Sequence, residues 1–118
     1  MTESILKDRF LEFAWSVYHL TKKFPKEPVY NVVTYQILKC SSSSAANYHA
    51  ACRGKSTSDF ANKLRIVEEE LDETIFWCKY IDGIDSKWIM YTEPLAKEGN
   101  ELLSIIIASK KTVLSKGN

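Results

Sequence analysis

The sequence predicts an all-α protein, an up-down-up-down four-helix bundle. Two observations lead to this fold class. In four long segments the apolar residues recur alternately four and three positions apart, and short breaks containing proline, glycine or capping residues separate these segments. The predicted helices span about residues 3–24, 29–54, 57–82 and 86–115. At 118 residues, with 45% hydrophobic and 26% charged side chains, the chain fits a single domain, residues 1–118.

The first segment, 3–24, places its apolar residues on one face of a helix. They are Leu6, Phe10, Phe13, Val17, Leu20 and Phe24. Trp15 and Tyr18 fall off this seam, where they either widen the core face or supply a second contact surface. Pro25 and Pro28 end the helix and predict a short connection.

The second segment, 29–54, changes from large to small side chains after Ile37. Its seam continues through Val33, Ile37, Cys40, Ser44, Asn47 and Ala51. A run of four serines, Ser41 to Ser44, would usually suggest a linker, but here it lies inside a helical pattern. We therefore expect helices to approach closely at this run. Asn47, in or beside the seam, must be hydrogen-bonded, and we interpret it as a residue that sets register in preference to one that binds a ligand.

The third segment, 57–82, begins with a capping signal. Gly54 is a natural C-terminal cap for the preceding helix, and Ser56 to Asp59 fit a capping box. Gly83 marks the end of the segment. Its seam consists of Phe60, Leu64, Val67, Leu71, Thr74, Cys78 and Ile81.

Pro94 interrupts the fourth segment, 86–115. Either a first turn at 86–92 precedes a helix that starts at Glu93, or one continuous helix kinks at the proline, and we favour the second alternative. Beyond it the apolar residues are too many for one stripe, which predicts a second burial partner for this helix. They are Leu95, Leu102, Leu103, Ile105, Ile106 and Ile107.

The charge distribution bears on possible partners. A net charge of +1 argues against strong, non-specific binding to a polyanion. Residues 36–65 nevertheless carry a net +4 and residues 66–85 a net −6, a pattern that suits self-association or intramolecular pairing at least as well as nucleic acid. Tyr48 is near enough in sequence to offer a stacking face. The candidate nucleic-acid contacts are Lys39, Arg53, Lys55, Lys63 and Arg65.

Neither catalysis nor a cofactor is predicted. His49 and Cys52, with Cys40 further along the helix, could hold part of a metal site, but no second pair completes four zinc ligands. Neither histidine follows a glutamate by three positions, as a di-iron bundle requires. No base and acid are placed to activate a serine or Cys52, and no glycine loop cradles a phosphate. We therefore expect no metal, no cofactor and no enzyme activity.

The cysteines indicate a compartment. Cys40, Cys52 and Cys78 leave one thiol unpaired in any disulfide scheme. Without a signal peptide, or an apolar run near the ~18 residues of a membrane span, the expected location is the reducing cytoplasm, with no membrane partner.

The central residues also resemble a family pattern. The chain is similar to the 23S ribosomal-RNA intervening-sequence proteins, a four-helix bundle family whose pattern includes A-N, S-x-x-D-F, K-L-x-I and E-x-x-E-T-x-x-W. The positions that match closely lie between residues 36 and 77. They are Gln36, Ser41, Ala46, Asn47, Ala51, Arg53, Ser56, Asp59, Phe60, Lys63, Leu64, Ile66, Glu70, Glu73, Thr74 and Trp77.

The resemblance implies an up-down bundle that assembles into a ring-like homo-oligomer, a pentamer in relatives, with an undetermined molecular role. Within the motif, Gln36, Asn47, Asp59, Phe60, Glu70, Glu73 and Trp77 would have structural roles. A distantly similar protein, the accessory variability protein of diversity-generating retroelements, forms a basic barrel that is thought to bind nucleic acid and a reverse transcriptase. The likeness of that protein to this chain is at the level of the fold.

The chain departs from the pattern at three positions. Residue 39 is lysine where the family usually has arginine, residue 49 is histidine instead of a small residue, and residue 50 is alanine where the family has glutamate. The missing carboxylate removes a partner for a basic residue such as Arg53. Two hypotheses follow: a non-enzymatic oligomeric scaffold or interaction module, and an RNA- or DNA-binding accessory protein that uses the basic residues of the second and third helices.

Overall fold

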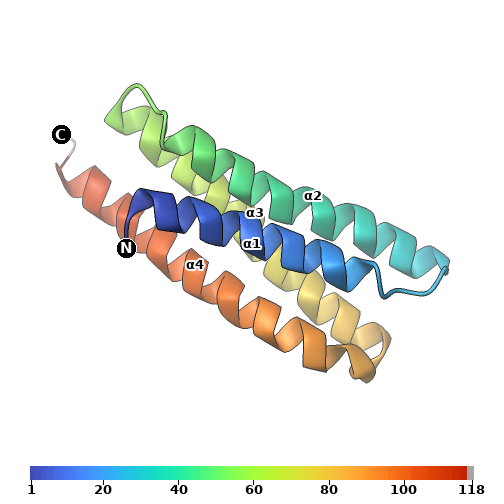
Figure 1. The fold of residues 1–118 in the computed structure, drawn as a ribbon. Helices are drawn as coiled ribbons and strands as arrows, with labels where there is room; N and C mark the ends of the chain where they lie inside the picture. Colours follow the sequence, from blue (N-terminus) through green and yellow to red (C-terminus); the bar gives the residue numbers. More distant parts are fainter. Residues whose placement is uncertain (117–118) are drawn as a thin grey trace.

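Four antiparallel helices lie side by side in the computed structural model, which describes residues 1–116 (Figure 1). They are α1 (Glu3–Thr21), α2 (Pro28–Ala51), α3 (Thr57–Ile84) and α4 (Ile89–Lys116), with a short 3₁₀ turn, η1 (Ser86–Trp88), before α4. The described chain contains no strand, so the predicted all-α four-helix bundle is confirmed. The bundle measures 50 × 21 × 20 Å.

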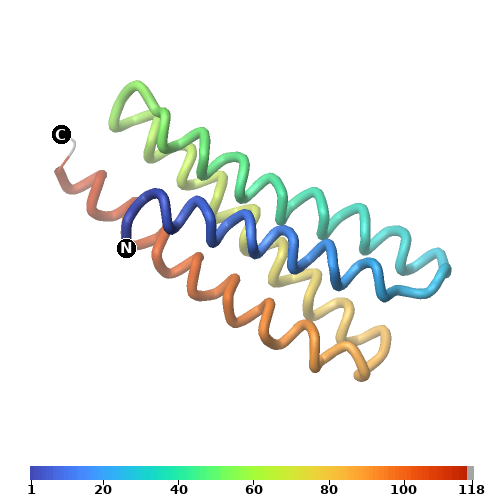
Figure 2. The backbone as a smooth tube through the Cα atoms, in the orientation of Figure 1, coloured from blue at the N-terminus to red at the C-terminus, as the bar shows by residue number. Residues whose placement is uncertain are grey.

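Each helix packs against its two neighbours around the bundle. α2 packs against α3, α3 against α4, and α1 against both α2 and α4, so that α1 and α3 lie diagonally opposite one another (Figures 1 and 2). The connection between α2 and α3, the start of α1 and the end of α4 all lie at the same end of the bundle. The connection between α1 and α2 and the turn η1 lie at the opposite end.

The predicted limits of the first two helices are too long. α1 ends at Thr21 instead of residue 24, and Phe24 packs from the connection onto Tyr30, with ring centroids 4.9 Å apart. α2 ends at Ala51 instead of residue 54. Pro28 fits its first turn, where the missing N–H would have no helical partner. Gly54 lies in the connection, where an added Cβ would come within 3.0 Å of the Ala51 carbonyl oxygen, so close backbone approach favours glycine there.

The third helix is longer than predicted. Ser56 caps it as expected, its Oγ accepting a hydrogen bond of 3.1 Å from the backbone N–H of Asp59. The helix continues through Gly83 to Ile84, because the chain turns only at Asp85, which has extended backbone angles. The Asp85 carboxylate then accepts a 3.0 Å hydrogen bond from the backbone N–H of Lys87 and starts η1.

The fourth helix is continuous through Pro94, so the helix is not broken there, while the kink expected at the proline stays a prediction. It begins at Ile89, because residues 86–88 form the 3₁₀ turn instead of α-helix. The proline ring leaves the carbonyl of Met90 without its usual donor, and Met90 is exposed, so water can reach that part of the chain.

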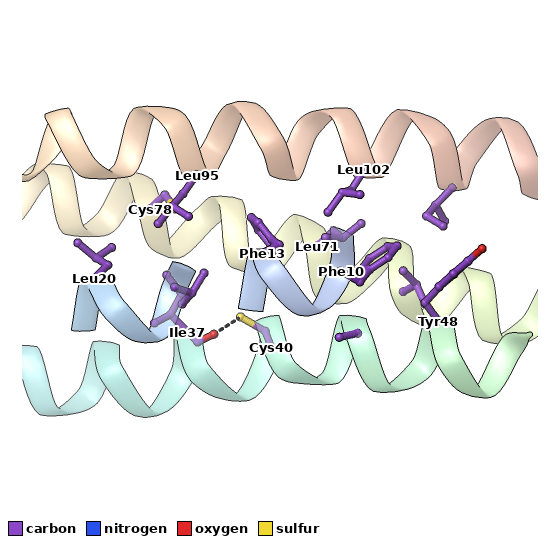
Figure 3. Packing of buried hydrophobic residues seen from close by; sticks show 14 of the residues in the cluster. Phe10, Phe13, Leu20, Ile37, Cys40, Tyr48, Leu71, Cys78, Leu95 and Leu102 are labelled. Carbon is purple, nitrogen blue, oxygen red and sulfur yellow. Dashed lines mark hydrogen bonds between the residues drawn. The ribbon is translucent and has the colours of Figure 1, made fainter. Parts of the chain in front are cut away.

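One hydrophobic core runs along the bundle (Figure 3). Phe10 stacks on Tyr48 near one end, with ring centroids 4.9 Å apart and an interplanar angle of 16°. Ser41 and Ser44 are buried, and each hydroxyl donates to a carbonyl three residues earlier on α2. The serine run is therefore part of a helix and of the core, as predicted. The largest fully buried side chains include Phe10, Ile37, Leu64, Leu71, Ile81, Leu102 and Ile106.

Of the extra apolar residues of α4, Leu95, Leu102 and Ile106 are buried and Leu103, Ile105 and Ile107 are half-buried within the chain, so a second burial partner for this helix stays a prediction. Leu103 and Ile105 pack against the core cluster, because α4 faces α3 on one side and α1 on the other. Three ion pairs join α4 to these neighbours. Arg9 on α1 contacts Glu98 and Glu101, and Lys110 lies 2.7 Å from Glu68 on α3.

Candidate functional site

Five residues of the family pattern, together with Ser43, lie on α2 and α3, the two helices that pack against one another. Gln36, Ser43 and Asn47 on α2, and Glu70, Glu73 and Trp77 on α3, are all half-buried. We call these six residues the motif strip. They lie beside the core seams of their helices, not in them, which places their polar groups between the buried core and solvent.

Within residues 1–116, the side-chain hydrogen bonds of Asn47 stay on its own helix, α2. Its Nδ2 donates to the carbonyl oxygen of Ser43 at 2.9 Å and lies 3.0 Å from the Ser43 hydroxyl, one turn earlier on α2. Tyr48, not Asn47, takes the buried position at this level of the helix. These contacts lock the side chain to its own helix and give no support to the register-setting role expected of Asn47.

Glu70 connects the strip across the two helices. Partial burial raises the pKa of its carboxyl group, and the negative charge of Glu73 raises it further, while a hydrogen bond from the Ser43 hydroxyl and the positive charge of Lys39 oppose the rise. The Ser43 hydroxyl of α2 is thus a partner of the Glu70 carboxyl group across the two helices. Glu73 stays on its own helix, where its carboxylate accepts a 3.3 Å hydrogen bond from the Trp77 indole.

We expect Glu70→Gln to raise the free energy of unfolding at about pH 7. A raised pKa in the folded state means that the protonated carboxyl contributes stability below its unfolded pKa, and that this stability is lost as the pH rises through the folded value. Glutamine stays neutral and can still accept from Ser43. Urea unfolding at about pH 4 and about pH 7 should show the gain shrinking at the lower pH. The exposed neighbour Glu69→Gln makes the same charge change and should show little difference; a loss of stability for Glu70→Gln at neutral pH would contradict the expectation.

Beneath the strip, Cys40 and Thr74 join the two helices inside the core. The Thr74 hydroxyl lies 3.1 Å from the Cys40 sulfur and 2.8 Å from the Glu70 carbonyl oxygen. Burial raises the pKa of the Cys40 thiol to about 11 and that of Cys78 to about 12. Since the thiolate is the reactive form, both cysteines are chemically inert at neutral pH. Cys52, half-buried, is also a free thiol whose pKa burial raises.

The five predicted nucleic-acid contacts do not form one patch. Arg53 and Lys55 lie in the connection between α2 and α3, whereas Lys39 stands fourteen residues earlier on α2, about 20 Å away along the helix. Lys63 and Arg65 are two positions apart on α3 and so point to different sides. Arg65 lines a hollow of about 290 Å³ that it shares with Lys110 of α4.

The structure places three further lysines at the end of the bundle that holds Arg53 and Lys55, which residue spacing in the sequence did not predict. Because α4 ends where α3 begins, Lys110, Lys111 and Lys116 lie at the same end as the α2–α3 connection (Figure 1). Residues 53–65 and 110–116 together contain seven cationic side chains and one carboxylate, Asp59. We call this region the basic end. Glu68, just outside the basic end, forms an ion pair with Lys110 that partly neutralises the charge of this lysine.

Asp59 and Phe60, the remaining motif residues, lie at the start of α3 beside the basic end. Asp59 is exposed in the first helical turn, where a carboxylate is favoured by the helix dipole, and Phe60 packs half-buried on the core. Both positions agree with a structural role at the helix start.

Neither a metal centre nor a membrane span is found in the described part of the chain. No three histidine, cysteine, aspartate or glutamate side chains within residues 1–116 gather closely enough to hold a metal ion. No helix within the same range is both long and apolar enough to cross a membrane.

Large apolar side chains are exposed on all four helices, including Met90 on α4 at 70%. Trp15 and Tyr18 on α1, Tyr35 on α2, and Phe76 and Tyr80 on α3 are exposed, with Phe76 at 53%. Trp15 and Tyr18 therefore follow the second alternative drawn from the sequence: they do not widen the core and are free to supply a contact surface. Between α1 and α2 the exposed pair borders a hollow of about 430 Å³.

Comparison with known proteins identifies a family and a similar crystal structure. The family model described as 23S rRNA-intervening sequence protein matches residues 3–108. A protein of unknown function from Bacteroides thetaiotaomicron, described as belonging to the S23 ribosomal protein family, is 30% identical, with a TM-score of 0.85. The alignment covers 94% of this chain and 99% of that one. No curated protein matches the sequence.

Proposed function

The chain belongs to the 23S rRNA-intervening sequence protein family, and from that premise we propose that it acts as a non-enzymatic, self-associating scaffold or interaction module. The observation that carries the proposal is the exposure of Trp15, Tyr35 and Phe76 on the outer faces of α1, α2 and α3. Contiguous apolar side chains on the surface of a small domain are typical of interaction sites, and Phe76 forms such a group with Trp77 and Tyr80.

The resemblance noted from the sequence leads us to propose a ring-like homo-oligomer of this chain, a pentamer, in the cytoplasm. Multi-angle light scattering measures the native mass directly. A pentamer would show five times the 13.5 kDa chain mass. A stable monomer across the working concentration range would overturn the scaffold proposal, because a scaffold of this kind requires contacts between copies.

A second candidate, RNA or DNA binding, is favoured by the basic end. Cations from the α2–α3 connection, the start of α3 and the end of α4 converge there, and assembly of several copies would multiply these weak sites. Arg53 is exposed, and the alanine at position 50 lacks the carboxylate that the family pattern places there. Arg53, Lys55 and Lys63 are the residues that we propose to contact phosphates.

We expect Arg53→Ala with Lys63→Ala to weaken binding to a structured RNA and to flatten its salt dependence. Each phosphate contact removed should reduce the log–log salt slope by roughly 0.7–0.9. Fluorescence anisotropy at several salt concentrations measures this slope. Lys26→Ala with Lys87→Ala, at the opposite end of the bundle, is the matched control and should leave the slope unchanged. Equal effects of the two pairs, or no binding by the wild-type chain at low salt, would rule out the basic end as the interface.

A further inference from the structure

We propose that two different faces of this chain bind one another across copies: the groove between α1 and α2 of one copy receives the aromatic ridge on the outer face of α3 of another. The groove is lined by Leu11, Trp15, Tyr18, Leu38, Ala45 and His49. The ridge consists of Phe76, Trp77 and Tyr80. This inference rests on the self-association proposed above and names the surfaces that carry it.

The groove has the shape to accept a protruding side chain. Its α2 side is built from small residues, among them Ser42 and Ala46, whereas Trp15 and Tyr18 rise on the α1 side. The hollow between them measures about 430 Å³, enough for large aromatic side chains. The small residues of the serine run thus serve two purposes: Ser41 and Ser44 pack inward, and Ser42 leaves room outside.

Helix α2 is unusually poor in charge for a helix with an open outer face. Among its 24 residues the only Asp, Glu, Lys or Arg is Lys39. The outer residues around that lysine are Tyr35, Ser42 and Ala46, all exposed. Charged residues are depleted at the centres of protein interfaces, where their desolvation is costly, and aromatic residues are enriched. The composition of α2 fits an interface better than a solvated surface.

The ridge is a preassembled block of aromatic rings. Phe76 lies edge-on to Trp77 at 5.0 Å between centroids, and Trp77 lies 5.2 Å from Tyr80. Phe76 is 53% and Tyr80 is 45% exposed. Rings that already hold one another lose little conformational freedom on binding, and each brings a large apolar area. The ridge therefore offers the groove an exposed, preassembled apolar surface.

Several charges around the two faces have opposite signs, whereas Lys79 beside the ridge and Glu12 one turn before Trp15 do not follow this pattern. Glu69 and Asp72 are exposed on α3 within two turns of Phe76, and Glu73 lies one turn before Trp77. At the groove, Lys39 is exposed beside the small residues of α2, and the ammonium of Lys22 lies 5.4 Å from the Tyr18 ring centroid. Opposite charges at the rim steer association and disfavour pairing of like faces. The groove of one copy should therefore prefer the ridge of another copy to a second groove.

The size and placement of the groove and the ridge are adequate for an interface between copies of the chain. A face two helices wide and as long as α1 covers about 600 Å² in projection, close to the ~800 Å² that each partner contributes to a standard interface. Since α3 lies diagonally opposite α1, one copy can offer its groove to one neighbour and its ridge to another (Figure 1). Such a heterologous contact builds a ring when its rotation closes.

A mixing experiment tests this pairing. Phe76→Glu breaks the ridge and keeps the groove, whereas Ser42→Arg blocks the groove and keeps the ridge. Each variant alone should be monomeric by multi-angle light scattering. Mixed in equal amounts, they retain one intact groove and one intact ridge, so a 1:1 heterodimer with twice the chain mass should form. Met90→Glu and Ser104→Arg make the same changes at exposed positions of α4 and should keep the wild-type mass.

The outcomes separate this inference from the function on which it rests. A monomeric wild-type chain overturns both. A wild-type oligomer that survives Phe76→Glu or Ser42→Arg keeps the scaffold and overturns the assignment of these faces, as would a mixture that remains monomeric. Circular dichroism checks that each variant is folded, and Tyr80→Ala serves as a milder ridge variant should Phe76→Glu fail to fold.

Discussion

Phe10→Ala is expected to lower the free energy of unfolding by about 3–5 kcal/mol. Phe10 is fully buried and stacks on Tyr48 of α2 at 4.9 Å between ring centroids. Truncation removes apolar burial and leaves a cavity between α1 and α2 that the rigid helices cannot fill completely. Urea unfolding followed by circular dichroism measures the loss. One protein concentration should be used throughout, because self-association adds to apparent stability.

Phe76→Ala is the matched control for this substitution. It makes the same chemical change on the outer face of α3, where the ring is half exposed and touches Trp77 and Tyr80. Exposed truncations outside the core usually cost little, so we expect a loss below about 1 kcal/mol in chain stability. Its effect should instead appear in the native mass. Equal destabilisation by the two substitutions would contradict the placement of Phe10 in the core and of Phe76 outside it.

Trp88→Ala should destabilise the opposite end of the bundle by about 3–5 kcal/mol. Trp88, in η1, is buried, and its ring meets the edge of Phe24 at 5.0 Å between centroids. Its indole Nε1 donates a 3.0 Å hydrogen bond to the Tyr30 hydroxyl at the start of α2. The residue thus joins the two connections that lie at this end, and thermal or urea unfolding should report its loss.

Tyr30→Phe separates the hydrogen bond from the packing. It preserves the ring and leaves the buried Trp88 indole without its acceptor, which should cost about 1–3 kcal/mol. A loss as large as that of Trp88→Ala would mean that the hydrogen bond, not burial of the indole, dominates this end. No measurable loss would show that water replaces the tyrosine hydroxyl.

The buried seam positions could be predicted from residue spacing, except late in α2, where the helix departs from the strict four-three pattern. Val33, Ile37, Cys40 and Ser44 are buried as expected, but one turn later Tyr48 is buried and Asn47 lies beside the core. A straight helix has 3.6 residues per turn, so a strict four-three spacing drifts by ~20° in each heptad. Over a helix as long as α2 this drift moves the inward position by one residue.

The basic end could be predicted only in part. Arg53 and Lys55 are neighbours in sequence, and their shared location follows from the short α2–α3 connection. The contribution of Lys110 and Lys111 depends on where a helix more than forty residues away ends. That placement comes from antiparallel packing of α4 on α3 and is not encoded in local spacing. Lys39, which the sequence grouped with the others, lies at the middle of α2 instead.

The sequence by itself determined the number of helices, their order, most of the core and the family, because apolar periodicity and turn residues are local properties of the chain. Only the tertiary structure decided which outer faces remain open. Trp15 and Phe76 are both aromatic and both lie off their seams, and nothing local tells whether a neighbouring helix covers them. Coverage depends on the relative rotation and length of helices packed from distant parts of the chain. That rotation leaves a groove between α1 and α2 and a ridge on α3, and these two faces are where the function of this bundle should be sought.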